Sequence, residues 1–171
     1  PPGVINVVPG DGANSIAIGR AWCESDTVRH LSFTGSTEVG RILMRQCAPS
    51  IKKLSLELGG NAPFIVFDDA DLDAAVEGAM ASKYRNAGQT CVGASRFYVQ
   101  DGVYDAFVEK LAAKARAIQV GNGFDAGVQQ GPLIDADALA KVEAHVQDAL
   151  ALGARLVCGA ERVGERSYAP T

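Results

Sequence analysis

The chain has 171 residues and a formal net charge of −4, and 47% of its residues are hydrophobic and 21% charged. Its length is enough for one domain, or two partial ones, with a hydrophobic core, and its composition is that of a globular protein. Because no cluster of Lys and Arg stands out, nothing indicates binding to nucleic acid or to an anionic membrane. No apolar run approaches the ~20 residues that a membrane span requires.

Strand-like and helix-like patterns alternate along the chain. Apolar or alternating runs predict strands at residues 4–8, 31–34, 53–58, 63–67, 96–100 and 155–158, and residues 167–171 resemble the start of another. Helical patterns cover about residues 13–23, 37–47, 102–118 and 136–152, and a further helix runs from the acidic residues at 68–71 to about residue 85. This alternation predicts an α/β fold, a parallel twisted sheet with crossover helices. Gly59-Gly60 is the one plausible domain boundary.

The four cysteines, at positions 23, 47, 91 and 158, form no CxxC motif and no cluster with histidine. This spacing argues against a zinc site and against a secreted disulfide framework, so we expect no metal and a reducing, cytoplasmic location. His30 lies beside an apolar strand and His145 in a helical pattern, and both are expected to be structural. The sequence therefore offers no good candidate for a mechanism that needs a histidine base.

Cys91 ends a loop of small and polar residues, Asn86-Ala87-Gly88-Gln89-Thr90, where a substrate could reach it. Taken alone, a cysteine is more often a small buried hydrophobe than a nucleophile. A nucleophilic thiol needs a base or a lowered pKa, and without a suitable histidine the candidate is a carboxylate. Glu57 lies at the end of the alternating strand 53–58, opposite its leucines, where strand ends form the usual crevice. An apolar pocket there would make Glu57 a general base, whereas the alternative is a solvated surface acid.

A third segment, Phe33-Thr34-Gly35-Ser36-Thr37, joins a strand to a helix through a tight turn. The backbone N–H groups at such a helix start form a cradle for an anion, Ser36 can donate to a phosphate, and Gly35 lets the ligand approach closely. The pattern is neither GxGxxG nor a Walker motif, and the alternative is an ordinary turn between a strand and a helix.

Taken together, the three segments resemble the consecutive signatures of the aldehyde dehydrogenase superfamily. They are Phe33-Thr34-Gly35-Ser36-Thr37, Leu56-Glu57-Leu58-Gly59-Gly60-Asn61 and Asn86-Ala87-Gly88-Gln89-Thr90-Cys91, in the family's order and with 34 residues between Glu57 and Cys91. Flanking phrases such as Pro63-Phe64-Ile65-Val66-Phe67 and Gly131-Pro132-Leu133-Ile134 match as well, so the resemblance spans essentially the whole chain. Within the superfamily, the sequence is most similar to bacterial succinate-semialdehyde dehydrogenases.

The resemblance implies oxidation of an aldehyde to a carboxylic acid with NAD or NADP as cofactor. Cys91 would form a thiohemiacetal and then a thioester, and Glu57 would activate the hydrolytic water. Gly35 and Ser36 would contact the pyrophosphate and Leu58 the nicotinamide end. Arg85 would hold the distal carboxylate of succinate semialdehyde, because guanidinium pairs bidentately with carboxylate. The alternative for Arg85 is a basic residue that faces a helix dipole.

The resemblance also predicts the domain organisation. Residues 1–58 would be the end of a Rossmann-like cofactor domain and residues 59–171 the first part of the catalytic domain. Other parts of the family's site, including the second oxyanion donor, have no counterpart in the sequence, so we expect a fragment that is inactive alone and whose parent is a homo-oligomer, a dimer or a tetramer. Many relatives carry a second cysteine where this chain has Gly93, so a disulfide switch between neighbouring cysteines is excluded here.

Three alternatives remain open at this point. The substrate could be another small aldehyde. The chain could be a non-catalytic interaction domain if its 171 residues are the complete product. It could also be a thiol acyl carrier that uses only Cys91.

Overall fold

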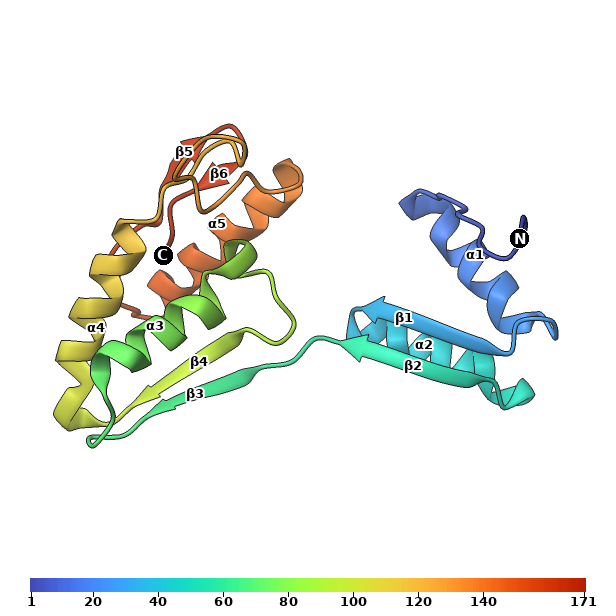
Figure 1. The fold of residues 1–171 in the computed structure, drawn as a ribbon, viewed down its shortest axis with the longest axis horizontal. Helices are drawn as coiled ribbons and strands as arrows, with labels where there is room; N and C mark the ends of the chain where they lie inside the picture. The colour runs from blue at the N-terminus through green and yellow to red at the C-terminus, as the bar shows by residue number, and fades with distance from the viewer. The chain divides into compact units, whose positions relative to one another are not determined.

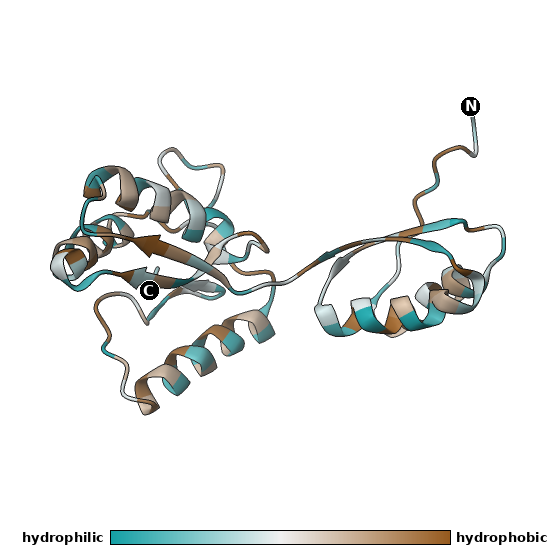
Figure 2. Cartoon of the chain, turned by 90° about the horizontal axis from the view of Figure 1, so that it is seen from below, coloured by the Kyte–Doolittle hydropathy of each residue, from teal (hydrophilic) through white to brown (hydrophobic).

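The computed structural model describes all residues from 1 to 171, in two compact units, Pro1–Gly60 and Asn61–Thr171. The division falls beside the Gly59-Gly60 pair, where the sequence placed the only plausible domain boundary. Residue by residue, the helices carry alternating hydrophilic and hydrophobic positions, as helices that cover a core do (Figure 2). None of the helices combines the length and the hydrophobicity that a membrane-spanning segment requires.

The first unit is built around one parallel strand pair. Its elements are α1 (Gly12–Glu24), β1 (His30–Gly35), α2 (Thr37–Cys47), the short 3-10 helix η1 (Ala48–Ser50) and β2 (Lys53–Leu58). β1 and β2 pair in parallel, with α2 as the crossover between them (Figure 1). Asp11 begins α1 by accepting a hydrogen bond from the N–H of Asn14, which satisfies one of the free donors of the first turn. The core of this unit comes from both helices and both strands, namely Cys23, Leu31, Leu43 and Cys47 with Phe33 and Leu54 against them.

The second unit begins with a second parallel pair. Its elements are β3 (Ala62–Val66), α3 (Leu72–Lys83), the short 3-10 helix η2 (Arg85–Gly88), β4 (Ala94–Val99), α4 (Asp101–Arg116), α5 (Ala136–Ala151), β5 (Arg162–Gly164) and β6 (Ser167–Tyr168). β3 and β4 pair in parallel with α3 as their crossover, whereas β5 and β6 form an antiparallel pair. The main core joins β3, α3 and α4 through Val66, Val76, Ala79 and Phe107. A smaller cluster of Leu133, Leu139 and Tyr168 holds α5 and the C-terminal strands.

The α/β class with parallel strands and crossover helices is confirmed, and so are the helices, to within two or three residues at most ends. Two predicted strands are wrong. Residues 4–8 are irregular and exposed, as are most of residues 155–158. Both runs are rich in β-branched or apolar residues, but neither has a neighbouring strand in the structure. A strand exists only where a second strand accepts its backbone hydrogen bonds, so propensity alone was insufficient.

Candidate active site

One end of the β1–β2 pair carries four of the predicted site residues. Thr34 is the register partner of Glu57 and Gly35 is that of Leu58, so both strands end at the same edge. Ser36 follows directly as the N-cap of α2. The structure therefore brings Gly35, Ser36, Glu57 and Leu58 together at the carboxyl edge of a parallel pair, where ligands of α/β proteins commonly bind.

Ser36 uses its side chain to begin α2. Its Oγ accepts a hydrogen bond of 3.2 Å from the N–H of Val39. As an acceptor in this bond, the hydroxyl keeps its own hydrogen for donation to a ligand. Gly35 is constrained by its neighbour, since a Cβ atom at this position would lie 2.4 Å from the Cζ atom of Phe33. A side chain at position 35 would therefore displace the aromatic ring that covers this turn.

Glu57 and Leu58 point in different directions, as the alternation of a strand requires. Glu57 is exposed and Leu58 is half-buried. The side chain of Leu58 lies against Gly40 of α2, where a Cβ atom would come 2.8 Å from its Cδ2 atom. Within the first unit, then, Leu58 is held in place and Glu57 is free to reach solvent or a ligand. The apolar surroundings expected for a general base are not supplied by this unit.

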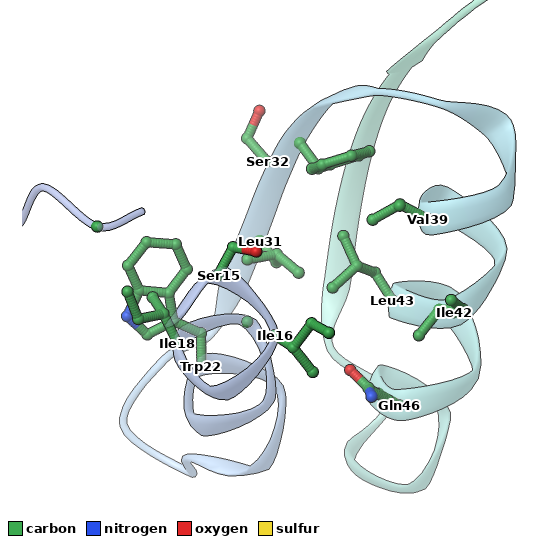
Figure 3. Close-up of a pocket in the computed structure, with 13 residues that line it drawn as sticks. Ser15, Ile16, Ile18, Trp22, Leu31, Ser32, Val39, Ile42, Leu43 and Gln46 are labelled. Atoms are coloured by element: carbon green, nitrogen blue, oxygen red, sulfur yellow. The ribbon is translucent and has the colours of Figure 1, made fainter. Parts of the chain in front are cut away.

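A cavity of about 580 Å³ lies in the first unit, and its lining includes Phe33 and Val39, which flank Gly35 and Ser36 in the sequence. Figure 3 shows it between α1 and α2, with the side chains of Ile16, Leu31 and Leu43 turned toward the same space. Its walls are predominantly apolar and include the only tryptophan of the chain, Trp22. This cavity could not be predicted from the sequence, because the apolar stripes of α1 and α2 look the same as ordinary core-facing stripes.

Cys91 lies in an exposed turn of the second unit, between η2 and β4. The N–H of Gly93 donates to the carbonyl of Thr90 at 3.0 Å, which closes the turn and places Cys91 and Val92 at its centre. The N–H groups of Cys91 and Val92 donate to no other group of the chain. The turn therefore presents a thiol together with free backbone donors, the groups that can stabilise an oxyanion.

The other three cysteines differ from Cys91. Cys23 and Cys47 are each 1% exposed, and Cys158 is partly buried. Burial, a hydrogen bond with Cys47 and the charge of Cys47 together raise the pKa of the Cys23 thiol to about 11. Only Cys91 therefore has the accessibility that a reactive thiol needs.

Arg85 begins η2, six residues before Cys91, and its side chain is exposed. The backbone that follows is unusual, since Asn86, Ala87 and Gly88 have φ values of 53°, 54° and 75°. Asparagine and glycine tolerate this left-handed region, whereas alanine pays roughly 1–2 kcal/mol. Two hydrogen bonds hold the segment, from the Nδ2 of Asn86 to the carbonyl of Gln89 and from the Oγ1 of Thr90 to the carbonyl of Arg85.

The C-terminal segment supports the same loop. The hydroxyl of Tyr84 donates to the carbonyl of Thr171 at 3.4 Å, and the Nε2 of Gln130 donates to the carbonyl of Tyr168 at 3.1 Å. Burial raises the pKa of Tyr84, with a smaller contribution from Cys158. Neither residue was predicted from the sequence, since a tyrosine before Arg85 and a glutamine in a glycine-rich loop carry no signal of their own. No group of three His, Cys, Asp or Glu side chains is placed to hold a metal ion.

Comparison with known proteins decides the family. The family model described as "Aldehyde dehydrogenase family" matches residues 1–171. The chain belongs to the aldehyde dehydrogenase family. An NADP(+) succinate-semialdehyde dehydrogenase of Escherichia coli is 62% identical over 173 residues, which cover 100% of this chain and 35% of that protein. A glutarate-semialdehyde dehydrogenase of Pseudomonas aeruginosa is 60% identical over the same share of each chain.

Solved structures of aldehyde dehydrogenases agree with this assignment. The crystal structure of a succinate-semialdehyde dehydrogenase from Burkholderia pseudomallei is 59% identical and superposes with a TM-score of 0.93, covering 99% of this chain and 35% of that one. The chain thus spans about a third of the length of the aldehyde dehydrogenases that it matches. The predicted resemblance to this family, and to its succinate-semialdehyde members, is confirmed.

Proposed function

We propose that the chain is the cysteine-bearing part of an NAD(P)-dependent aldehyde dehydrogenase that oxidises a short aldehyde with a distal carboxylate, most simply succinate semialdehyde. The observation that carries this proposal is the exposed Cys91 in a turn whose backbone N–H groups are free, six residues after an exposed arginine. Relatives named for succinate and for glutarate semialdehyde support the substrate class.

The chemistry begins at the thiol. The Cys91 thiolate attacks the aldehyde carbon, and a C–S bond forms as the C=O π electrons move onto oxygen. The N–H of Cys91 donates to this oxyanion in the thiohemiacetal, and loss of one such donor costs of order 3 kcal/mol in catalysis. When the oxyanion collapses, the carbon loses a hydride and becomes a thioester. NAD(P), when bound, supplies the hydride acceptor.

Hydrolysis then releases the product. Glu57 takes a proton from water as the water oxygen attacks the thioester carbon, and the C–S bond breaks to return the thiolate and the carboxylic acid. Glu57 suits this role because it is exposed at the carboxyl edge of β2, next to the residues proposed to hold the cofactor. Throughout, the guanidinium of Arg85 holds the distal carboxylate of the substrate in a bidentate pair.

The first unit fits a dinucleotide. The free hydroxyl hydrogen of Ser36 and the N-terminal N–H groups of α2 would bind the pyrophosphate, with Gly35 beside it. The apolar cavity between α1 and α2 has the size and lining for the flat base of a nucleotide. Leu58, fixed against Gly40, would contact the nicotinamide end. We extend the proposal to a cytoplasmic enzyme, in keeping with four cysteines that are all free. We also propose that the whole protein is a homo-oligomer of two or four chains, as the family resemblance implies.

The substrate assignment is tested in the full-length protein that contains these residues, with Arg85→Ala and Arg85→Lys variants. We compare succinate semialdehyde with butanal, which has the same chain length but no carboxylate. Arg85→Ala should lower kcat/KM for succinate semialdehyde by about 10- to 100-fold and leave butanal within about threefold, because only the charged substrate loses its ion pair with the guanidinium. Arg85→Lys should retain part of the kcat/KM that Arg85→Ala loses, since lysine keeps the positive charge but lacks the planar guanidinium. An equal effect on both aldehydes would reject the assignment.

The cofactor site is tested in the chain itself. Trp22 is the only tryptophan and lines the cavity, so its fluorescence reports occupancy. Millimolar NAD or NADP should quench it weakly, and Ile42→Phe, which fills the space without adding a second tryptophan, should abolish saturable quenching by the dinucleotide. Nicotinamide mononucleotide, which lacks the adenine base, is the control. Quenching that is equally strong with the mononucleotide would contradict the placement of the base.

A further inference from the structure

Ser82 connects the last turn of α3 to the start of β4. Its Oγ accepts a hydrogen bond of 3.0 Å from the N–H of Ala94, the first residue of that strand. The bond is shielded from solvent on the side of Ala94, which is 4% exposed. A hydrogen bond from helix to strand thus spans the segment that contains the reactive turn.

The turn itself sits on the same residue. A Cβ atom at Gly93 would lie 3.0 Å from the carbonyl oxygen of Ser82 and 3.2 Å from that of Thr90, so the backbone of Gly93 is packed closely between them. The N–H of Gly93 is already used to close the turn onto Thr90. Through its hydroxyl and its carbonyl, Ser82 therefore contacts both residues that follow the exposed pair of Cys91 and Val92.

We propose that Ser82 is a positioning residue for Cys91, holding the turn from Thr90 to Gly93 in the one conformation that presents the thiol with free N–H groups. The inference rests on the proposed role of Cys91 as nucleophile. Ser82 touches neither substrate nor cofactor, and it acts through the backbone of Gly93 and Ala94. Without its hydroxyl, the N–H of Ala94 loses its partner, and the turn gains conformers in which the donors at Cys91 no longer stabilise negative charge on the thiolate or on an oxyanion.

The test uses the 171-residue chain with Ser82→Ala, Ser82→Thr and, as the matched control, Ser95→Ala. Ser95 is an exposed serine one residue beyond Ala94, and its hydroxyl makes no hydrogen bond within the chain. The rate of alkylation of Cys91 by iodoacetamide is followed on its peptide by mass spectrometry. Hydrogen exchange in α4 reports whether the second unit stays folded, and alanine, the strongest helix former, should preserve α3.

Ser82→Ala should slow alkylation of Cys91 about fivefold, the factor that one ordinary hydrogen bond is worth, while Ser82→Thr and Ser95→Ala stay within about twofold. Restoration by threonine shows that the hydroxyl is what matters, which a role in packing alone would not produce. A rate for Ser82→Ala within about twofold of the unmodified chain would overturn the inference. If hydrogen exchange in α4 shows that the Ser82→Ala variant is unfolded, the isosteric variants Ser82→Thr and Ser82→Val are compared instead. Equal rates of Cys91 alkylation in these two variants would overturn the inference.

The same experiment separates this inference from the proposed function. A short peptide of residues 88–94 gives the reactivity of the thiol without the fold. If Cys91 in the unmodified chain reacts no faster than in the peptide, the proposed nucleophile is wrong. A fast Cys91 whose rate does not depend on Ser82 leaves the function intact and removes only the role of Ser82.

Discussion

The side chain of Leu58 occupies the space that a side chain at Gly40 would need, with its Cδ2 atom 2.8 Å from the position of a Cβ atom there. This contact fixes the last residue of β2 against α2, at the edge that carries Glu57. Close approach between a strand end and a helix requires a residue without a side chain, and Gly40 meets that requirement.

Gly40→Ala should therefore destabilise the first unit, whereas Gly19→Ala should not. Alanine gains up to about 1 kcal/mol of helix propensity at either position, but overpacking against Leu58 costs about 1–3 kcal/mol at position 40. At Gly19 a Cβ atom would make an ordinary contact of 3.7 Å with Leu43. Urea unfolding of both variants measures the difference, and a more stable Gly40→Ala chain would show that Leu58 moves freely.

Ala87→Gly should stabilise the second unit by up to about 1 kcal/mol, because glycine adopts the left-handed conformation of this residue without strain. The control is Ala81→Gly, an exposed position of α3, where the same exchange should cost about 1 kcal/mol. The two substitutions are chemically identical and differ only in backbone conformation. Thermal unfolding in which both are destabilising would contradict the left-handed assignment of Ala87.

The stability of the first unit should decrease as the pH rises from about 9 to about 11. The Cys23 thiol keeps its proton in the folded state up to about 11, against 9.0 as its ordinary pKa. Over this interval the unfolded chain binds fewer protons than the folded one, so the free energy of unfolding falls with pH. Cys23→Ala removes this titration, and its melting temperature should decline less steeply between pH 8 and pH 10.5. Parallel curves for the two chains would rule out the raised pKa.

Gln130→Leu should loosen the C-terminal strands. Gln130 is 9% exposed, and its amide donates to the carbonyl of Tyr168 in β6. Leucine leaves that carbonyl without a partner in a buried place, at a cost of about 1–3 kcal/mol. Gln147→Leu, on an exposed part of α5, is the control and should change stability by less than about 0.5 kcal/mol. Limited proteolysis should cut the Gln130 variant after residue 160 first, and resistance equal to that of the control would count against the contact.

The sequence predicted the helices, the strands that make up the two parallel pairs, and the family. Helical periodicity and capping residues such as Asp11 and Asp71 act over a few residues, so they can be recognised without knowing the fold. The candidate residues also came from sequence, because Cys91, Glu57 and Ser36 lie in segments whose order and spacing match the aldehyde dehydrogenases.

Other features were decided only by the tertiary structure. Residues 4–8 have strand propensity but no strand beside them. Whether a neighbouring strand is present cannot be read from the residues of the segment itself. Three features join residues that lie at least 12 positions apart in the chain. They are the cavity between α1 and α2, the contact of Leu58 with Gly40, and the hydrogen bond between Ser82 and Ala94. Such contacts depend on how elements pack, whereas a pattern in the sequence reports only which face of an element is apolar. The candidate nucleophile was predicted from the sequence, and the way its turn is held is seen only in the fold.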